Sequence, residues 1–270
     1  MIKENATVKN GYLIKYYPDE NEQIITISND VEVIGSAFLH NCSAMQAKVE
    51  KVIIPPSVTE IAPSAFYGCE NLATIEFEDP ESVIKIGISA FNGCAKLVNI
   101  KLPNSISILN KMVFYGCSSL QNIVIPESVK IIEDSAFEKC SSLTKIVIPS
   151  SVEKISYCSF YYCKDLTEVI IENSKKQLII EPFAFIGCEK LSTIKLSDKI
   201  QRIYHDAFAK CPSIKEIHID NNYSDVAFQD FDKNWDNETG EFNVIFNNDK
   251  TLTKEEAKRV RIGKTSFLNK

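Results

Sequence analysis

The sequence predicts a β-rich solenoid, a stack of about eight coils of 23–25 residues each. A phenylalanine recurs at intervals of 25, 23, 23, 23, 25 and 23 residues, and a cysteine three residues after each one keeps the same intervals. A short run of alternating apolar residues precedes each pair, and in several copies a proline ends that run. Self-similarity with a period of about 20 to 29 residues is typical of solenoids, in which each coil covers the apolar face of its neighbour. The recurring residues are Phe66, Phe91, Phe114, Phe137, Phe160, Phe185 and Phe208, with Cys69, Cys94, Cys117, Cys140, Cys163, Cys188 and Cys211.

The coil that begins at Leu143, LTKIVIPSSVEKISYCSFYYCKD, shows the unit L-x-x-I-x-I-P-x-x-V-x-x-I-x-x-x-A-F-x-x-C most clearly. The alternating residues of LTKIVIP predict a short strand with one face in the core, and Pro149 ends it because proline cannot donate to a β-ladder. VEKI predicts a return run on the opposite side of the coil. The small residue, Phe and Cys then form the corner that closes the coil, with Phe filling the interior. Stacking places equivalent residues in columns about 4.8 Å apart.

The signature P-x-x-V-x-x-I-x-x-x-A-F-x-x-C resembles that of the BspA-like leucine-rich repeat family, over residues 24 to 219. The resemblance implies a leucine-rich repeat stack and a role in surface adhesion or host interaction, often in secreted proteins. Met112 and Val113 replace Ser-Ala in one copy, and two copies carry two extra residues, in FEDPESV and IIENSKKQL.

Both ends of a coil stack expose apolar faces and need caps. We expect residues 1–30 to form an N-terminal cap, in which GYLIKYYPDENEQIITIS is a hairpin that turns at PDENE. The solenoid then spans residues 31–219. Residues 220–270 form the C-terminal cap, with a hairpin turning near Gly240 and a short helix that has Thr253 as its N-cap and Glu256 in a capping box.

Composition argues against several classes of function. The chain has 270 residues, of which 44% are hydrophobic and 24% charged, as in a soluble globular protein. Its net charge of -6 argues against nucleic-acid binding, and its apolar runs are too short for membrane insertion. The N-terminus lacks the apolar stretch of a secretion signal. We therefore expect a cytoplasmic protein as written, or an extracellular one if Met1 follows a removed signal.

The sequence predicts no catalytic centre, no cofactor and no metal site among its cysteines. Buried thiols in apolar surroundings are inert, so the cysteine column is expected to consist of free structural thiols. Zinc needs four converging ligands, whereas Cys158 and Cys163 are the only close pair. We expect Cys158 to lie at the surface, in the position of the serines of other coils. As a nucleophile it would need a nearby base, and His205 is expected two coils away, about 10 Å along the stack.

Two motifs in the last 41 residues suggest ligand binding. GKTS at 263–266 is similar to a phosphate-binding loop, but Lys258 occupies the place where that loop needs a glycine. In DFDKNWDNETGE, Asp230 to Glu241 provide acidic or amide side chains at the ligand positions of a calcium loop. Trp235 replaces the glycine that the sharp turn of such a loop requires. An acidic, solvated hairpin is therefore favoured, and calcium binding is the alternative.

The strand face is the predicted site of function. One outward residue lies between the two inward residues of each strand, and in three adjacent coils it is apolar: Val124, Val147 and Ile170. Lys101, Lys145, Glu168 and Lys195 surround this row with charge. An apolar centre with a polar rim is typical of a protein-binding patch, whereas β-propensity alone also favours exposed Val and Ile. We predict a non-catalytic module that binds a protein partner through this face. The alternative is an intracellular structural or scaffold protein without a dedicated ligand.

Overall fold

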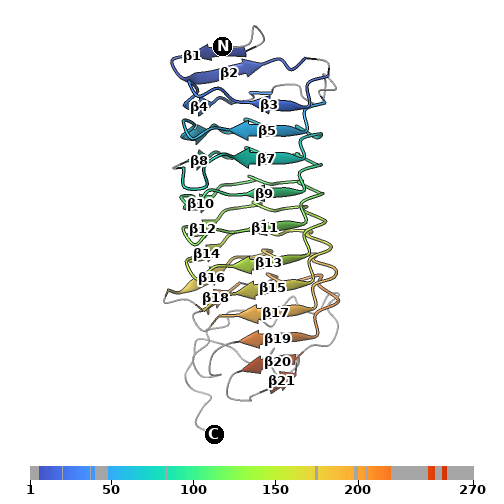
Figure 1. The fold of residues 1–270 in the computed structure, drawn as a ribbon. Helices are drawn as coiled ribbons and strands as arrows, with labels where there is room; N and C mark the ends of the chain where they lie inside the picture. The colour runs from blue at the N-terminus through green and yellow to red at the C-terminus, as the bar shows by residue number, and fades with distance from the viewer. Residues whose placement is uncertain are drawn as a thin grey trace.

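The structure of the protein is a computed structural model. It describes residues 6–19, 21–36, 38–39, 48–82, 84–173, 176–197, 200–204, 206–219, 243–246 and 251–253. Every regular element in these ranges is a β-strand. Figure 1 shows that the strands stack into a single column of coils, with the N-terminus at one end. The predicted β-solenoid of about eight coils is therefore confirmed.

One side of the column, which we call the strand wall, is built from the first strand of each coil (Figure 1). Neighbouring strands of this wall are parallel, and they form two sheets, which meet between β11 and β13. The strands are β3 (Ile24–Thr26), β5 (Lys51–Ile54), β7 (Thr74–Phe77), β9 (Asn99–Lys101), β11 (Asn122–Val124), β13 (Lys145–Ile148), β15 (Glu168–Ile171), β17 (Thr193–Leu196) and β19 (Glu216–Ile219).

The opposite side, the return wall, holds the second strand of each coil. It is also divided into two sheets, between β8 and β10. Its strands are β4 (Val33–Ile34), β6 (Glu60–Ile61), β8 (Lys85–Ile86), β10 (Ile108–Leu109), β12 (Ile131–Ile132), β14 (Lys154–Ile155), β16 (Leu178–Ile180) and β18 (Ile200–Ile203). The corner segments that carry the Phe and Cys residues connect the return wall to the next strand of the strand wall.

The register of both walls follows the repeat. On the strand wall Val147 pairs with Ile170, Ile170 with Lys195, and Lys195 with His218. Equivalent positions of successive coils therefore lie side by side, as the spacing predicts. Inward residues such as Ile146 and Val169 are fully buried, so one face of each strand forms the core.

The recurring phenylalanines form a continuous stack along the core. From Phe66 to Phe208 the centroids of neighbouring rings lie 4.9 to 5.5 Å apart, with interplanar angles of 2 to 17°. At the N-terminal end, Phe38 meets Phe66 edge-on at 5.6 Å, and Tyr16 packs against Phe38 at 5.8 Å. Each ring of the column is fully or almost fully buried. The spacing of about 4.8 Å between coils thus matches the distance at which aromatic rings pack.

The column cysteines from Cys94 to Cys211 connect each coil to the preceding one. In six coils the thiol donates a hydrogen bond to the carbonyl oxygen of the phenylalanine in the coil before, with Sγ to O distances of 3.2 to 3.4 Å. Cys140, for example, donates to Phe114 and Cys163 to Phe137. All eight cysteines in the described ranges are free and buried. A thiol is small and apolar and is still a weak donor, which suits it to this dry position.

The corner of each coil contains two residues with left-handed backbone. The residue two before each phenylalanine has φ between 54° and 60°, at Ser64, Ser89, Met112, Ser135, Cys158, Phe183 and Asp206. The residue before each cysteine has φ between 56° and 76°, at Gly68, Gly93, Gly116, Lys139, Tyr162, Gly187 and Lys210. This conformation costs a residue with a side chain about 1 kcal/mol or more, and it costs glycine almost nothing. Glycine in four of the seven coils is therefore explained by the turn.

Opposite substitutions at this second corner position are expected to change stability in opposite directions. A Cβ on Gly116 would lie 3.9 Å from its nearest neighbour, so Gly116→Ala adds backbone strain without a clash. We expect the substitution to lower the free energy of unfolding by about 1 kcal/mol. Lys210→Gly removes the same backbone strain at an exposed lysine, so it is expected to raise the free energy of unfolding slightly. Urea denaturation of both variants measures the two effects, and a neutral Gly116→Ala variant would contradict the assigned backbone conformation.

The predicted N-terminal hairpin is wrong in its position. The hairpin lies earlier, between β1 (Ala6–Lys9) and β2 (Tyr12–Tyr16), which are antiparallel. Asn10 and Gly11, with φ of 51° and 76°, form its two-residue turn, as expected for an Asn-Gly hairpin. The strands on either side of PDENE separate instead, because β2 pairs with β4 in one sheet while β3 pairs with β5 in another. PDENE therefore connects the two walls.

At the C-terminal end the strand wall continues past Ile219. β20 (Asn243–Phe246) pairs in parallel with β19, and β21 (Thr251–Thr253) pairs antiparallel with β20. Thr253 is the last residue of β21, and the helix that it was expected to cap lies outside the described residues, as does the predicted turn near Gly240. The boundaries at 1–30, 31–219 and 220–270 stay predictions.

Candidate protein-binding surface

The strand wall presents the row Val124, Val147 and Ile170 outward, because side chains alternate between the two faces of a strand. In β11 the residues on either side of Val124, Ile123 and Ile125, are buried, whereas the Val124 side chain is 79% exposed. Val147 is 36% exposed, and Ile170, its direct partner in the β-ladder, is half-buried. The predicted apolar row therefore exists on the surface of the strand wall.

Val124 is the most exposed large apolar residue among those that the structure describes. Its strand is the last of one sheet, and the next strand, β13, is the first of the following sheet. On its other side Val124 pairs with Lys101. The interruption of the ladder beside Val124 leaves its side chain less covered than those of Val147 and Ile170.

The charged residues predicted at this surface also lie on the strand wall. Glu168 forms ion pairs with Lys145, at 2.7 Å from Nζ to oxygen, and with Lys195, at 3.9 Å. Lys101 is exposed at the other end of the row. The structure thus brings all seven predicted residues together on one wall: Lys101, Val124, Lys145, Val147, Glu168, Ile170 and Lys195.

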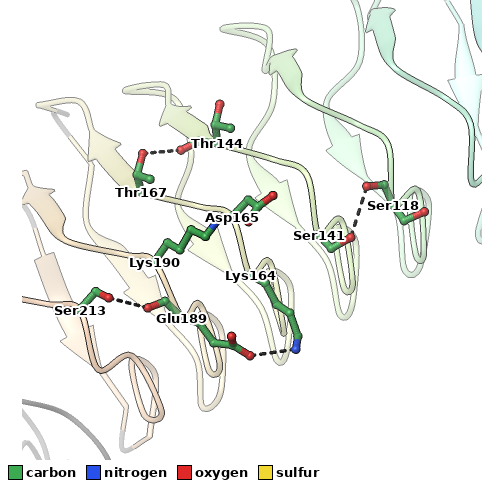
Figure 2. Close-up of polar contacts among 9 residues, drawn as sticks. All are labelled: Ser118, Ser141, Thr144, Lys164, Asp165, Thr167, Glu189, Lys190 and Ser213. Carbon is green, nitrogen blue, oxygen red and sulfur yellow. Dashed lines mark hydrogen bonds and ion pairs between the residues drawn. The ribbon is translucent and has the colours of Figure 1, made fainter.

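Beside the row, polar side chains are engaged in contacts between coils (Figure 2). The Thr167 hydroxyl donates to the carbonyl oxygen of Thr144 at 2.9 Å, and the Ser213 hydroxyl donates to the backbone carbonyl oxygen of Glu189 at 2.7 Å. Ion pairs join Lys164 to Glu189 at 2.9 Å and Lys190 to Asp165 at 2.7 Å, and Figure 2 shows them near the loops that follow the cysteines. Such exposed pairs contribute little stability individually. Because they connect neighbouring coils, we assign them to the stack and not to ligand binding.

Cys158 is buried, which contradicts its predicted surface position. It is 7% exposed, and burial raises the pKa of its thiol to about 11. It does occupy the corner position of Ser64, Ser89 and Ser135, with φ of 55°. Sequence reasoning treated that position as exposed because serine usually lies there. Near neutral pH the raised pKa keeps Cys158 protonated, so the geometry offers no activated nucleophile at this corner. His205, the base considered for it, lies outside the described residues.

The possible calcium loop from Asp230 to Glu241 also lies outside the described residues. Within the ranges that the structure describes, no group of three or more His, Cys, Asp or Glu residues is placed to hold a metal ion. In the same ranges, no helix has the length and apolar character that crossing a bilayer requires.

Sequence reasoning missed an aromatic edge made by Tyr157, Tyr161, Tyr162 and Phe183. The rings of Tyr157 and Phe183 meet edge-on at 5.5 Å, and those of Tyr161 and Tyr162 lie 4.5 Å apart. Phe183 and Tyr162 occupy left-handed corner positions where other coils have serine or glycine. The Tyr162 ring packs so closely on Gly187 that a Cβ there would lie 2.9 Å from it. In the sequence, this edge is indicated only by the corner segments of two successive coils, YCSFYYC and PFAFIGC, which depart from the repeat signature.

Comparison with known proteins agrees with this architecture. The family model described as BspA type Leucine rich repeat region (6 copies) matches residues 15–140, 45–167 and 157–255. The chain is similar to the solved leucine rich repeat protein of T. pallidum, with 32% identity over 57% of this chain and 72% of that one, and a TM-score of 0.49. It is similar to a leucine rich cell surface protein from Faecalibacterium prausnitzii, with 21% identity over 79% of this chain and 88% of that one, and a TM-score of 0.38. A leucine-rich repeat protein from Bacteroides ovatus has 19% identity over 91% of this chain and 99% of that one, with a TM-score of 0.35.

No curated protein sequence matches the chain. The family match spans most of the chain, which therefore belongs to the BspA-type leucine-rich repeat family.

Proposed function

We propose that this chain is a non-catalytic module that binds another protein through its strand wall. The observation that carries the proposal is the row of Val124, Val147 and Ile170, three outward aliphatic side chains in adjacent coils of the strand wall. Protein interfaces commonly combine an apolar centre with a polar, solvent-accessible rim, and here Lys145, Glu168 and their neighbours provide that rim. A role in adhesion, which the family resemblance implies, is one form of such binding.

The competing explanation is that exposed Val and Ile merely suit β-strands. It predicts that the row contributes nothing to recognition. The return wall provides a control, because Ile108, Ile131 and Ile179 also project outward there and are half-buried or, for Ile108, 36% exposed. The return wall therefore offers three outward aliphatic residues for comparison, with Lys154 between Ile131 and Ile179.

The triple substitution Val124→Thr, Val147→Thr and Ile170→Thr is expected to weaken binding of the native partner about tenfold or more. Threonine keeps the β-branched shape, so folding survives, while the hydroxyl must be desolvated at the interface. The partner is captured from an extract of the native host with the tagged wild-type chain and identified by mass spectrometry. Its affinity is then measured for the wild type, the strand-wall variant and the control Ile108→Thr, Ile131→Thr and Ile179→Thr.

Unchanged affinity of the strand-wall variant, with both variants folded, would show that this row is not the binding site. Equal losses in the two variants would point to a general effect of the substitutions. Capture of nothing but further copies of the chain would favour the alternative of a structural or scaffold protein.

A further inference from the structure

The apolar row is the centre of a longer column that ends in lysine on both sides. Val124 pairs with Lys101, Val147 with Ile170, and Ile170 with Lys195. The outward residues of five successive coils are therefore lysine, three aliphatic residues, and lysine. We call this set, Lys101, Val124, Val147, Ile170 and Lys195, the lysine-bracketed column.

The strand wall is positively charged around this column although the whole chain carries a net charge of -6. Strands β9, β11, β13, β15 and β17 contain three lysines and one glutamate, a net charge of +2. The glutamate, Glu168, is held most closely by Lys145, at 2.7 Å, while Lys195 lies 3.9 Å from it. Among the described residues none forms an ion pair with Lys101. Beyond the two ends, Glu76 is paired with Lys51 and Glu216 lies 3.0 Å from His218. The net positive charge of the five strands therefore favours an acidic partner.

The shape of the column favours an extended segment over a helix. The apolar row is one residue wide, because the neighbouring column consists of Asn99, Asn122, Lys145, Glu168 and Thr193. An amphipathic helix binds through a broad apolar stripe, which this wall lacks. An extended chain instead exposes N–H and C=O groups along its length, and the exposed amides of Asn99 and Asn122 can both donate and accept hydrogen bonds.

The length of the lysine-bracketed column determines how far apart the acidic groups of a bound peptide must lie. Four intervals at about 4.8 Å separate the lysines by about 19 Å. An extended chain advances about 3.3 Å per residue and its side chains alternate between two faces, so two carboxylates that reach both lysines lie about six positions apart. We propose that the strand wall binds an extended peptide segment with acidic side chains about six positions apart and aliphatic side chains between them. This inference rests on the proposed function and adds the chemical class of the ligand.

A peptide series tests the proposed spacing. Fluorescein-labelled decapeptides carry two glutamates separated by two to nine positions, about 7 to 30 Å when extended, with valine and threonine between them. Their binding to the intact chain is followed by fluorescence polarisation. We expect the tightest binding at a separation of six, and binding about tenfold weaker when lysine replaces both glutamates. Binding should also weaken as the salt concentration rises.

Reversal of the protein's charges provides the matched control. In the variant Lys101→Glu and Lys195→Glu, the preference is expected to invert, so that the lysine peptide of the same spacing binds better than the glutamate peptide. The variant Lys101→Gln and Lys195→Gln, which introduces no new charge, should weaken the glutamate peptide and leave the lysine peptide unimproved. Circular dichroism of both variants confirms that they are folded.

Binding of the glutamate peptides without dependence on their spacing, or a charge reversal that leaves the preference unchanged, would overturn this inference. So would the absence of measurable binding by every peptide of the series. In each of these cases the proposed function is tested separately, because the affinity of the native partner for the threonine variant of the apolar row does not depend on the peptide results. A partner that binds the wild type, loses affinity for the threonine variant and is indifferent to both lysine variants would support the proposed function and reject the acidic ligand.

Discussion

Phe137→Ala is expected to lower the free energy of unfolding by about 3 to 5 kcal/mol, the usual range for truncation of a buried phenylalanine. The Phe137 ring is fully buried in the middle of the column, with Phe114 at 5.4 Å on one side and Phe160 at 5.0 Å on the other. Truncation removes both stacking contacts and leaves a cavity that two neighbouring coils line. Because each coil depends on its neighbours for burial, the loss is expected to destabilise the whole stack.

Urea denaturation measures this loss, and two substitutions serve as controls. Phe137→Leu keeps much of the buried volume and should cost less than the alanine variant. Tyr157→Ala removes an aromatic side chain that is 46% exposed and should cost still less. A loss below about 1 kcal/mol for Phe137→Ala would mean that the ring is not part of a tightly packed interior.

Raising the pH from 8 to 10 is expected to lower the free energy of unfolding of the chain, by roughly 2 kcal/mol for each buried thiol that stays protonated in the folded state. Burial raises the pKa of the thiols of five cysteines: Cys117, Cys140, Cys158, Cys163 and Cys188. In the unfolded chain these thiols ionise near pH 8.5, the usual value for cysteine. A group whose pKa is raised by folding stabilises the protein below its unfolded pKa, and that stabilisation is lost as the pH rises toward the folded pKa. The loss therefore begins near pH 8.5 and grows with pH.

The variant Cys140→Ala tests the origin of this pH dependence. It removes one of the five thiols, so the decrease in stability between pH 8 and pH 10 should shrink by about a fifth, whatever the stability of the variant at pH 8. Thiol titration in denaturant should find close to nine free thiols, the number of cysteines in the chain. Finding four disulfides, or a stability that does not change over this pH range, would contradict the account of the cysteine column.

The repeat made most of the fold predictable from the sequence. Lockstep spacing of Phe and Cys predicts stacking in register, and the ladder pairs Val147–Ile170 and Ile170–Lys195 confirm it. The surface row was predictable for the same reason, because alternation within a strand decides which side chains point outward. In a solenoid most contacts join equivalent positions of neighbouring coils, so the spacing of the repeats contains most of the tertiary information.

The features that the sequence did not reveal arise where the repeat begins or where the corner depends on backbone geometry. At the N-terminus, PDENE and Asn10-Gly11 are both turn signals, and pairing with the first coil decides between them. At Cys158, the consensus serine suggested exposure, but the thiol is buried, whereas Ser64 and Ser89 with the same left-handed backbone are half-buried. The hydrogen bond from each thiol to a phenylalanine carbonyl, such as Cys140 to Phe114, depends on coil stacking distance and has no sequence signature besides the cysteine itself.

Hydroxyl-radical footprinting of the chain, alone and saturated with its captured partner, tests the binding surface most directly. This method compares the solvent accessibility of individual side chains in the two states. The account predicts that the partner protects Val124, Val147 and Ile170 on the strand wall and leaves Ile108 on the return wall and Tyr157 on the aromatic edge unchanged. Protection of Ile108 or Tyr157, with Val124 as accessible as in the free chain, would contradict it.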